Sequence, residues 1–159
     1  MHSLRVGSVF EISQNGIFAY GQVVGRDLEM LSSRVLIIFK GRYSQPIELT
    51  ALANAEIDFY CHTYFADPIK QWRHVGTLPV PDTTQLLFKD VNYEKEDGPP
   101  SEGPSKHWRI WHLDGELKNV KAKDKQLNFA ELGGALSPRA VERRIFEGKY
   151  GITYYGATY

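Results

Sequence analysis

The hydrophobic and polar positions at the start of the chain form two short β-rich runs joined by a turn. The runs cover residues 7–12 and 17–24, and Asn15 and Gly16 lie between them. Both turn residues tolerate positive φ, so this dipeptide predicts a β-hairpin. Apolar residues of the first run do not keep to one face, which predicts a strand buried on both sides or bulged near Ser8.

The middle of the chain carries the strongest strand patterns. Residues 35–39 are continuously apolar and predict a buried central strand. Residue types alternate over 55–65, so Cys61 and His62 fall on opposite faces of one strand. We expect a buried thiol and an exposed imidazole there. Weaker patterns predict strands over 72–78 and 86–88 and a short helix over 46–53.

A loop and a second hairpin follow. Seven of the nine residues in 97–105 are Gly, Pro or Ser, which indicates a loop. Asp114 and Gly115 separate two further β-rich runs, 106–113 and 116–120, and predict a hairpin.

The end of the chain predicts an α-helix. Ser137 is a good N-cap, Pro138 suits the first helical position, and Gly148 suits the C-terminal end. Residues 121–136 show no regular pattern, and the aromatic tail 152–159 could form a last strand.

Together these elements predict an α+β fold. We expect a mainly antiparallel, strongly twisted or barrel-like sheet with the C-terminal helix packed on it. A chain of 159 residues with 42% apolar residues is long enough for one domain with a real core, so we assign 1–159 to a single domain.

The net charge of the chain is zero, because 19 basic residues balance 19 acidic ones, so only local clusters of charge are informative. This balance disfavours a nucleic-acid partner. Residues 89–105 hold five acids and two lysines, whereas 117–126 hold four lysines and one acid. An acidic loop over 92–105 could speed capture of a basic partner, or it could only aid solubility. The candidate contact residues in it are Glu94, Glu96, Asp97 and Glu102.

Cysteine content and the N-terminal sequence favour the cytoplasm. Cys61 is the only cysteine, so no disulfide forms within the chain. The first ten residues lack the pattern of a signal peptide, and the longest apolar run, 35–39, is too short to span a bilayer. We therefore expect a cytoplasmic protein without a membrane partner.

No pattern of catalytic or metal-binding residues stands out. Adjacent Cys61 and His62 point to opposite faces and cannot act together as nucleophile and base. The remaining histidines lack zinc spacing, so we expect no metal and no cofactor. The best candidate for an enzyme site is the strand face that carries Asp58, Tyr60 and His62.

The three tryptophans are candidates for either core or contact. Trp108 and Trp111 fall on opposite faces of one predicted strand, so we expect one in the core and the other covered by the helix or exposed. Core packing is the default for such large rings. Trp72 and Trp111 are kept as candidate contacts with a partner.

Several segments resemble the immunity protein 26 family of bacterial polymorphic toxin systems. They are VGSVFEI at 6–12, AYGQV at 19–23, WRHVG at 72–76, the hairpin around Trp108 and AVERRI at 140–145. The resemblance implies an immunity protein that binds and neutralises a cognate bacterial toxin without catalysis. It assigns no catalytic residue.

Two alternatives stay open. A Gly-rich, aromatic hairpin at the start also suits a small SH3-like barrel that binds a peptide or a nucleic acid. The other alternative is a small enzyme with a site near His62 and Asp58, which would need a deep pocket with convergent polar groups.

Overall fold

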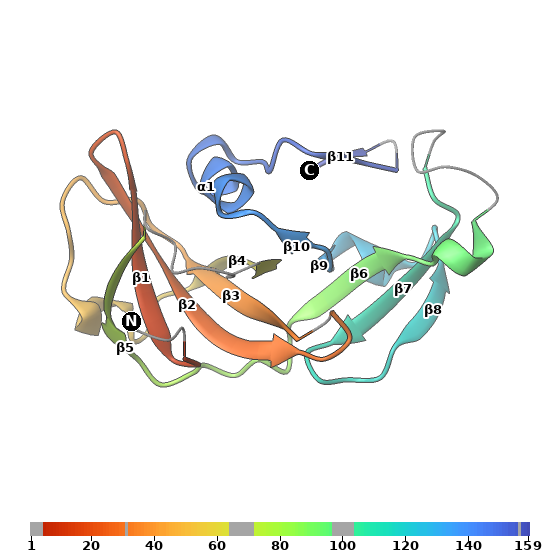
Figure 1. Cartoon of the computed structure of the whole chain (residues 1–159), viewed down its shortest axis with the longest axis horizontal. Coiled ribbons are helices and arrows are strands. Elements are labelled where there is room, and N and C mark those ends of the chain that lie inside the picture. Colours follow the sequence, from red (N-terminus) through yellow and green to blue (C-terminus); the bar gives the residue numbers. More distant parts are fainter. Residues whose placement is uncertain (1–4, 31, 64–71, 97–103, 156) are drawn as a thin grey trace.

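The computed structural model describes residues 5–30, 32–63, 72–96, 104–155 and 157–159 (Figure 1). It contains a six-stranded sheet in the order β10-β4-β3-β2-β1-β5, a four-stranded sheet in the order β8-β7-β6-β9 and the hairpin β11-β12. The strands are β1 (Ser8–Gln14), β2 (Ile17–Asp27), β3 (Ser33–Phe39), β4 (Ile57–Thr63), β5 (Arg73–Thr77), β6 (Leu87–Val91), β7 (His107–His112), β8 (Lys118–Lys121), β9 (Glu131–Leu132), β10 (Ala135–Leu136), β11 (Thr153–Tyr154) and β12 (Ala157–Thr158). The helices are η1 (Leu49–Leu52), η2 (Tyr93–Lys95), η3 (Lys125–Asn128) and α1 (Pro138–Glu147).

The α+β class is confirmed, and the sheets are open rather than closed barrels. Most pairings are antiparallel, while the short strands β9 and β10 add parallel pairings at the sheet edges. The first hairpin forms as predicted, with φ of 51° at Asn15 and 77° at Gly16. The register of β1 against β5 shifts between Val9 and Phe10, which confirms the irregularity expected near Ser8.

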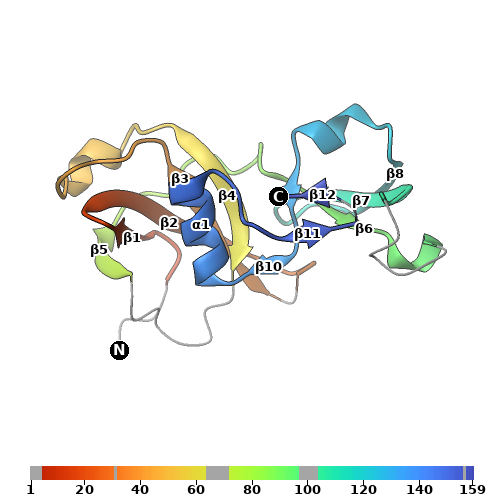
Figure 2. The same cartoon turned by 90° about the horizontal axis from the view of Figure 1, so that it is seen from above.

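Both faces of the six-stranded sheet are buried. Helix α1 covers one face, as seen from above in Figure 2. The four-stranded sheet covers part of the other face, through Phe88 and Trp111. The apolar side chains of the α1 face are Phe10, Ile12, Ala19, Val23, Leu36, Ile38, Phe59, Cys61, Trp72, Leu136, Ala140, Val141, Ile145 and Tyr150. The central strand β3 therefore has apolar residues on both sides, as its continuous apolar run predicts.

A third apolar cluster lies on the four-stranded sheet. Leu127 and Ala130, which follow β8, pack there with Tyr155 of the C-terminal hairpin. Their partners in the sheet are Leu87, Val91, Trp108 and Ile110. The expectation that 121–136 is irregular is wrong in part, because η3, β9 and β10 form within it. These elements are too short to show a sequence period, and contacts distant in sequence stabilise them.

The short helix predicted over 46–53 is reduced to the single turn η1. The backbone N–H of Ile47 donates to the Tyr20 hydroxyl over 3.0 Å, so the preceding segment is tied to the sheet instead of coiling. Tertiary contact overrides the local helix signal here.

Helix α1 begins and ends where the sequence predicts. The Ser137 hydroxyl accepts a hydrogen bond from the Ala140 N–H over 3.3 Å, and Pro138 occupies the first turn. Gly148 closes the helix with a φ of 82°, in the left-handed region that favours glycine.

We predict that Ser137→Ala lowers the free energy of unfolding by about 1 kcal/mol, because it removes the N-cap acceptor. Ser137→Asp, which keeps an acceptor, should stay within a few tenths of a kcal/mol of the parent protein. Urea denaturation of the three proteins measures this. Equal midpoints for the parent and the alanine variant would contradict the cap.

Candidate binding site

The residues proposed as an enzyme site do not converge. The Asp58 carboxylate pairs with Arg42 at 2.8 Å. The Tyr60 hydroxyl donates to the backbone carbonyl of Leu87 and accepts from its N–H, both over 3.0 Å. Asp58 and Tyr60 therefore each bind a different structural partner, and they do not share a pocket with His62.

His62 is fully buried, and the expectation of an exposed imidazole is wrong. Its Nε2 donates to Asp27 Oδ2 over 2.7 Å, and the indole N–H of Trp111 donates to the same oxygen over 2.7 Å. Both the His62 and Asp27 side chains are 0% exposed. Alternation on β4 correctly separates His62 from Cys61, but the second sheet covers the face that the sequence suggested was open.

The Asp27 carboxylate stays charged in this interior. Burial alone would raise the pKa of Asp27, but hydrogen bonds from His62 and Trp111 hold the pKa below its ordinary value of 3.8. The other carboxylate oxygen accepts the N–H of Glu29 over 3.0 Å. His62 Nδ1 is buried without a partner among the described residues. The imidazole ring also packs against the Phe88 ring.

Trp72 and Trp111 are core residues, which corrects their reading as surface contacts. Trp72 is 5% exposed and Trp111 is 2% exposed. The Trp72 indole donates to Glu142 on α1 over 2.7 Å. Trp108 is also buried. Trp108 and Trp111 lie on opposite faces of β7, and an apolar cluster covers each of these faces.

The acidic loop is only partly described. Glu94 is exposed and Glu96 is half-buried, whereas Asp97 and Glu102 lie outside the described residues. Glu96 Oε1 accepts from the Ser105 hydroxyl and from the N–H groups of Lys106 and His107. The Ser105 hydroxyl contributes most to holding the pKa of Glu96 below its ordinary value. Glu96 thus closes the base of the loop.

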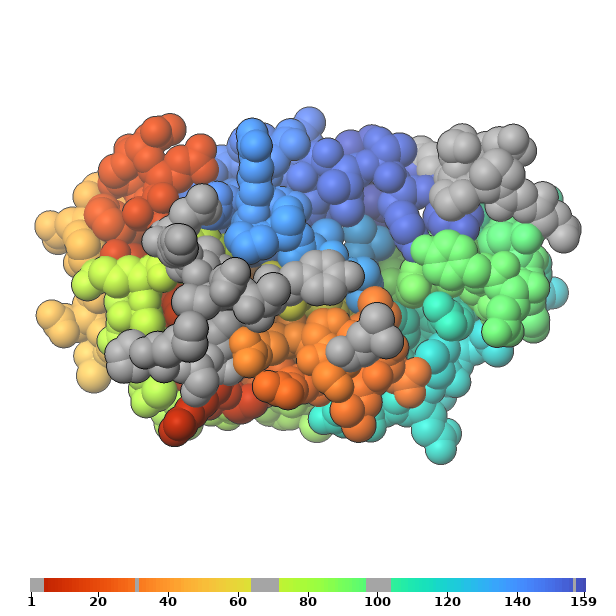
Figure 3. Space-filling view, viewed as in Figure 1, coloured from red at the N-terminus to blue at the C-terminus, as the bar shows by residue number. Residues whose placement is uncertain are grey.

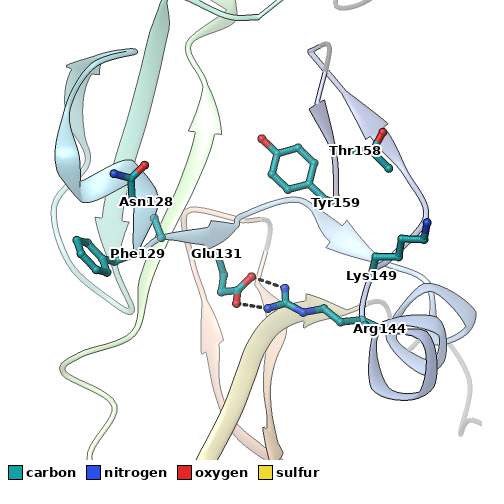
Figure 4. Close-up of a pocket in the computed structure, with 9 residues that line it drawn as sticks. Asn128, Phe129, Glu131, Arg144, Lys149, Thr158 and Tyr159 are labelled. Atoms are coloured by element: carbon teal, nitrogen blue, oxygen red, sulfur yellow. Dashed lines mark hydrogen bonds and ion pairs between the residues drawn. The ribbon is translucent and has the colours of Figure 1, made fainter.

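A surface hollow lies between η3, the C-terminal end of α1 and the last residues of the chain (Figure 4). Its volume is about 370 Å³. Its floor is an ion pair: the Arg144 guanidinium donates to both Glu131 oxygens, over 2.5 and 2.6 Å. Its remaining lining comes from Asn128, Phe129, Ala130, Gly148, Lys149, Thr158 and Tyr159.

The ion pair gives this hollow a fixed floor. Arg144 lies over the rings of Phe59 and Tyr150, with its central carbon 4.2 and 4.7 Å from their centroids. Burial alone would lower the pKa of Arg144, but the hydrogen bonds to Glu131 raise it. A guanidinium held by two rings and two hydrogen bonds has little freedom, so the floor is preorganised.

The rim of the hollow presents groups that suit contact with another molecule. Phe129 is 78% exposed, and Figure 4 shows its ring beside the hollow, turned away from Glu131 and Arg144. The Lys149 side chain is exposed on the opposite side of the hollow. Figure 4 shows the Tyr159 ring reaching across the hollow from the C-terminal segment. Such an arrangement can accept a protein side chain with both apolar and polar parts.

Sequence reasoning did not find this hollow. Glu131 lies in the stretch without a regular pattern, and Arg144 lies on a helix whose polar positions all resemble ordinary surface. Only the folding of the chain after β8 back over the sheet brings the two together.

No family model, curated protein or solved structure matches this chain. In the part of the chain that the structure describes, no three His, Cys, Asp or Glu side chains are grouped to hold a metal ion. Among the same residues, no helix has the length and apolarity needed to cross a membrane.

We predict that Asp27→Asn lowers the free energy of unfolding by about 2 kcal/mol at neutral pH, because two buried donors lose a charged acceptor. The pKa of Asp27 is lowered by folding, so its contribution is present above pH 3.8 and is lost as the pH falls toward the folded value. The difference between the two proteins should therefore shrink below about pH 4.

Urea denaturation from neutral to acidic pH measures this difference. Asp58→Asn is the matched control, because Asp58 is half-exposed and should contribute less than about 1 kcal/mol at any pH. A difference for Asp27→Asn that stays constant down to pH 2.5 would contradict the assignment.

Proposed function

We propose that this protein binds a partner protein and inhibits it stoichiometrically, without catalysis, and that the partner is the cognate toxin domain of a bacterial polymorphic toxin system. The resemblance to the immunity protein 26 family suggests the class of partner. The observation that carries the proposal of a protein partner is the exposed Phe129 beside the hollow with the Glu131–Arg144 floor.

Phe129 is the most exposed of the large apolar side chains in the described residues, at 78%. Aromatic and arginine side chains around a rigid pocket are typical of the energetic centre of a protein interface. Because Arg144 is already held in place, a partner side chain that enters the hollow orders few new groups, which lowers the entropic cost of binding.

The two alternatives have weaker support. A barrel-type peptide reader needs a closed sheet, whereas both large sheets are open. An enzyme at the Asp58 and His62 face needs substrate access, whereas His62 is sealed between Phe88 and Asp27.

The test begins with the neighbouring reading frame, where we expect a large toxin gene with a variable C-terminal domain. That C-terminal domain is then co-expressed with this protein. We expect restored growth of cells that produce the toxin domain and a one-to-one complex on size-exclusion chromatography. Loss of toxicity without a complex, or no protection at all, would contradict the proposal.

We predict that Phe129→Ala raises the Kd for the toxin domain at least tenfold, or about 1.4 kcal/mol, because it removes an interface anchor. Leu28→Ala is the matched control, since Leu28 is 76% exposed and does not line the hollow. It should change the Kd less than about twofold. Isothermal titration calorimetry measures both, and equal effects of the two substitutions would remove Phe129 from the interface.

A further inference from the structure

The outer edge of β8 is one of the two outer edges of the four-stranded sheet. β8 is the terminal strand in the order β8-β7-β6-β9, and no strand of the described residues pairs with its other side. Figure 1 shows it at one end of the molecule, and Figure 3 shows the green to cyan residues of that end at the surface. Lys118, Asn119 and Lys121 are exposed.

The hydrogen-bond pattern shows which backbone groups point outward. The Ala122 N–H donates to the Lys106 carbonyl over 3.0 Å, so this pair is a hydrogen-bonded pair of the β7–β8 ladder. Pairs alternate in an antiparallel ladder, so the backbone groups of Asn119 and Lys121 turn away from β7. The hydrogen bond of the Lys121 carbonyl fits this orientation, because the carbonyl accepts the N–H of Asp124 over 2.9 Å instead of an N–H of β7.

Three outward groups thus remain on this edge: the N–H and C=O of Asn119 and the N–H of Lys121. They form the donor and acceptor row that a further strand needs. Unpaired edges invite association, and lysine side chains commonly prevent it.

Four lysines lie on β8 or within the four residues that follow it. Among the described residues, no carboxylate pairs with Lys118, Lys121, Lys123 or Lys125. The nearby Asp124 carboxylate accepts the N–H of Gln126 over 2.9 Å. The lysines therefore repel a basic strand and the same edge of a second copy, and they attract an acidic strand.

We propose that the β8 edge receives an acidic, extended segment of a partner protein, which adds a strand to the four-stranded sheet and places its carboxylates beside these lysines. This inference rests on the proposed function, because it names the chemistry of the partner. Nucleic acid would satisfy the lysines, but it would leave the strand-like donors and acceptor of Asn119 and Lys121 unused.

The first experiment is an NMR titration of the full chain with three probes. They are a short peptide of alternating Asp and Thr, a peptide of equal charge with alternating Asp and Pro, and a short oligothymidylate. The Asp-Thr peptide should bind most tightly, shift the amide signals of Asn119 and Lys121, and slow their hydrogen exchange. Rising salt should weaken the binding.

Two variants separate strand pairing from charge. Lys121→Pro removes the outward N–H without removing a bond of the β7 ladder, whereas Lys121→Gln removes only the charge. We expect Lys121→Pro to weaken Asp-Thr binding roughly fivefold and Lys121→Gln about twofold. A double variant, Lys118→Glu with Lys121→Glu, reverses the charge on β8 and should prefer a Lys-Thr peptide. Binding of that peptide would show that the sheet of the variant is intact.

Equal affinity for the Asp-Pro peptide, tighter binding of the oligonucleotide, or shifts confined to other strands would overturn the proposal. The peptide titration does not use the toxin. Peptide binding without toxin protection would therefore contradict only the proposed function. Protection that is unchanged in the Lys121→Pro variant would contradict only the β8 edge.

Discussion

The buried carboxylate of Asp27 is the constraint on which the arrangement of the two sheets depends. Asp27 ends β2 in the six-stranded sheet, His62 lies on β4 of the same sheet, and Trp111 lies on β7 of the other sheet. A buried charge is tolerated only when it is hydrogen-bonded, so the two sheets must dock where both donors reach one oxygen. Apolar packing alone would allow the two sheets to slide against each other. The hydrogen bond between Asp27 and Trp111 fixes their relative position. Gly133 completes the fit, since a Cβ there would meet the Trp111 ring.

The surface hollow follows from that docking. Once Trp111 fixes the four-stranded sheet, the chain after β8 crosses its face and enters β9, which places Glu131 opposite α1. The helix is held on the six-stranded sheet by its own apolar stripe and by Arg42, whose Nε donates to the Ile145 carbonyl over 2.9 Å. Glu131 and Arg144 thus belong to elements positioned independently, and their ion pair joins the two parts of the fold. The floor of the hollow is therefore set by contacts between β9 and α1.

Local signals in the sequence predicted local structure well. The hairpin at Asn15 and the helix from Ser137 to Gly148 depend on backbone preferences of adjacent residues, and both form as expected. The exposure expected for His62 was wrong because alternation tells which residues share a face but not whether a second layer covers that face. The hollow was missed for a related reason. Its floor depends on a contact between a short strand and a helix that no periodicity links.

The zero net charge of the chain does not show where charged side chains are paired and where they are not. From the sequence, the acidic loop was the candidate to attract a basic partner, and the lysine run was given no role. In the structure, Glu96 is engaged by the loop base, while the four lysines near β8 have no carboxylate partner among the described residues. Charges satisfied within the fold contribute little to recognition, because their field is neutralised locally. Among the described residues, the lysines without a carboxylate partner thus lie beside the outward backbone groups of β8, which is why we propose an acidic partner segment for that edge.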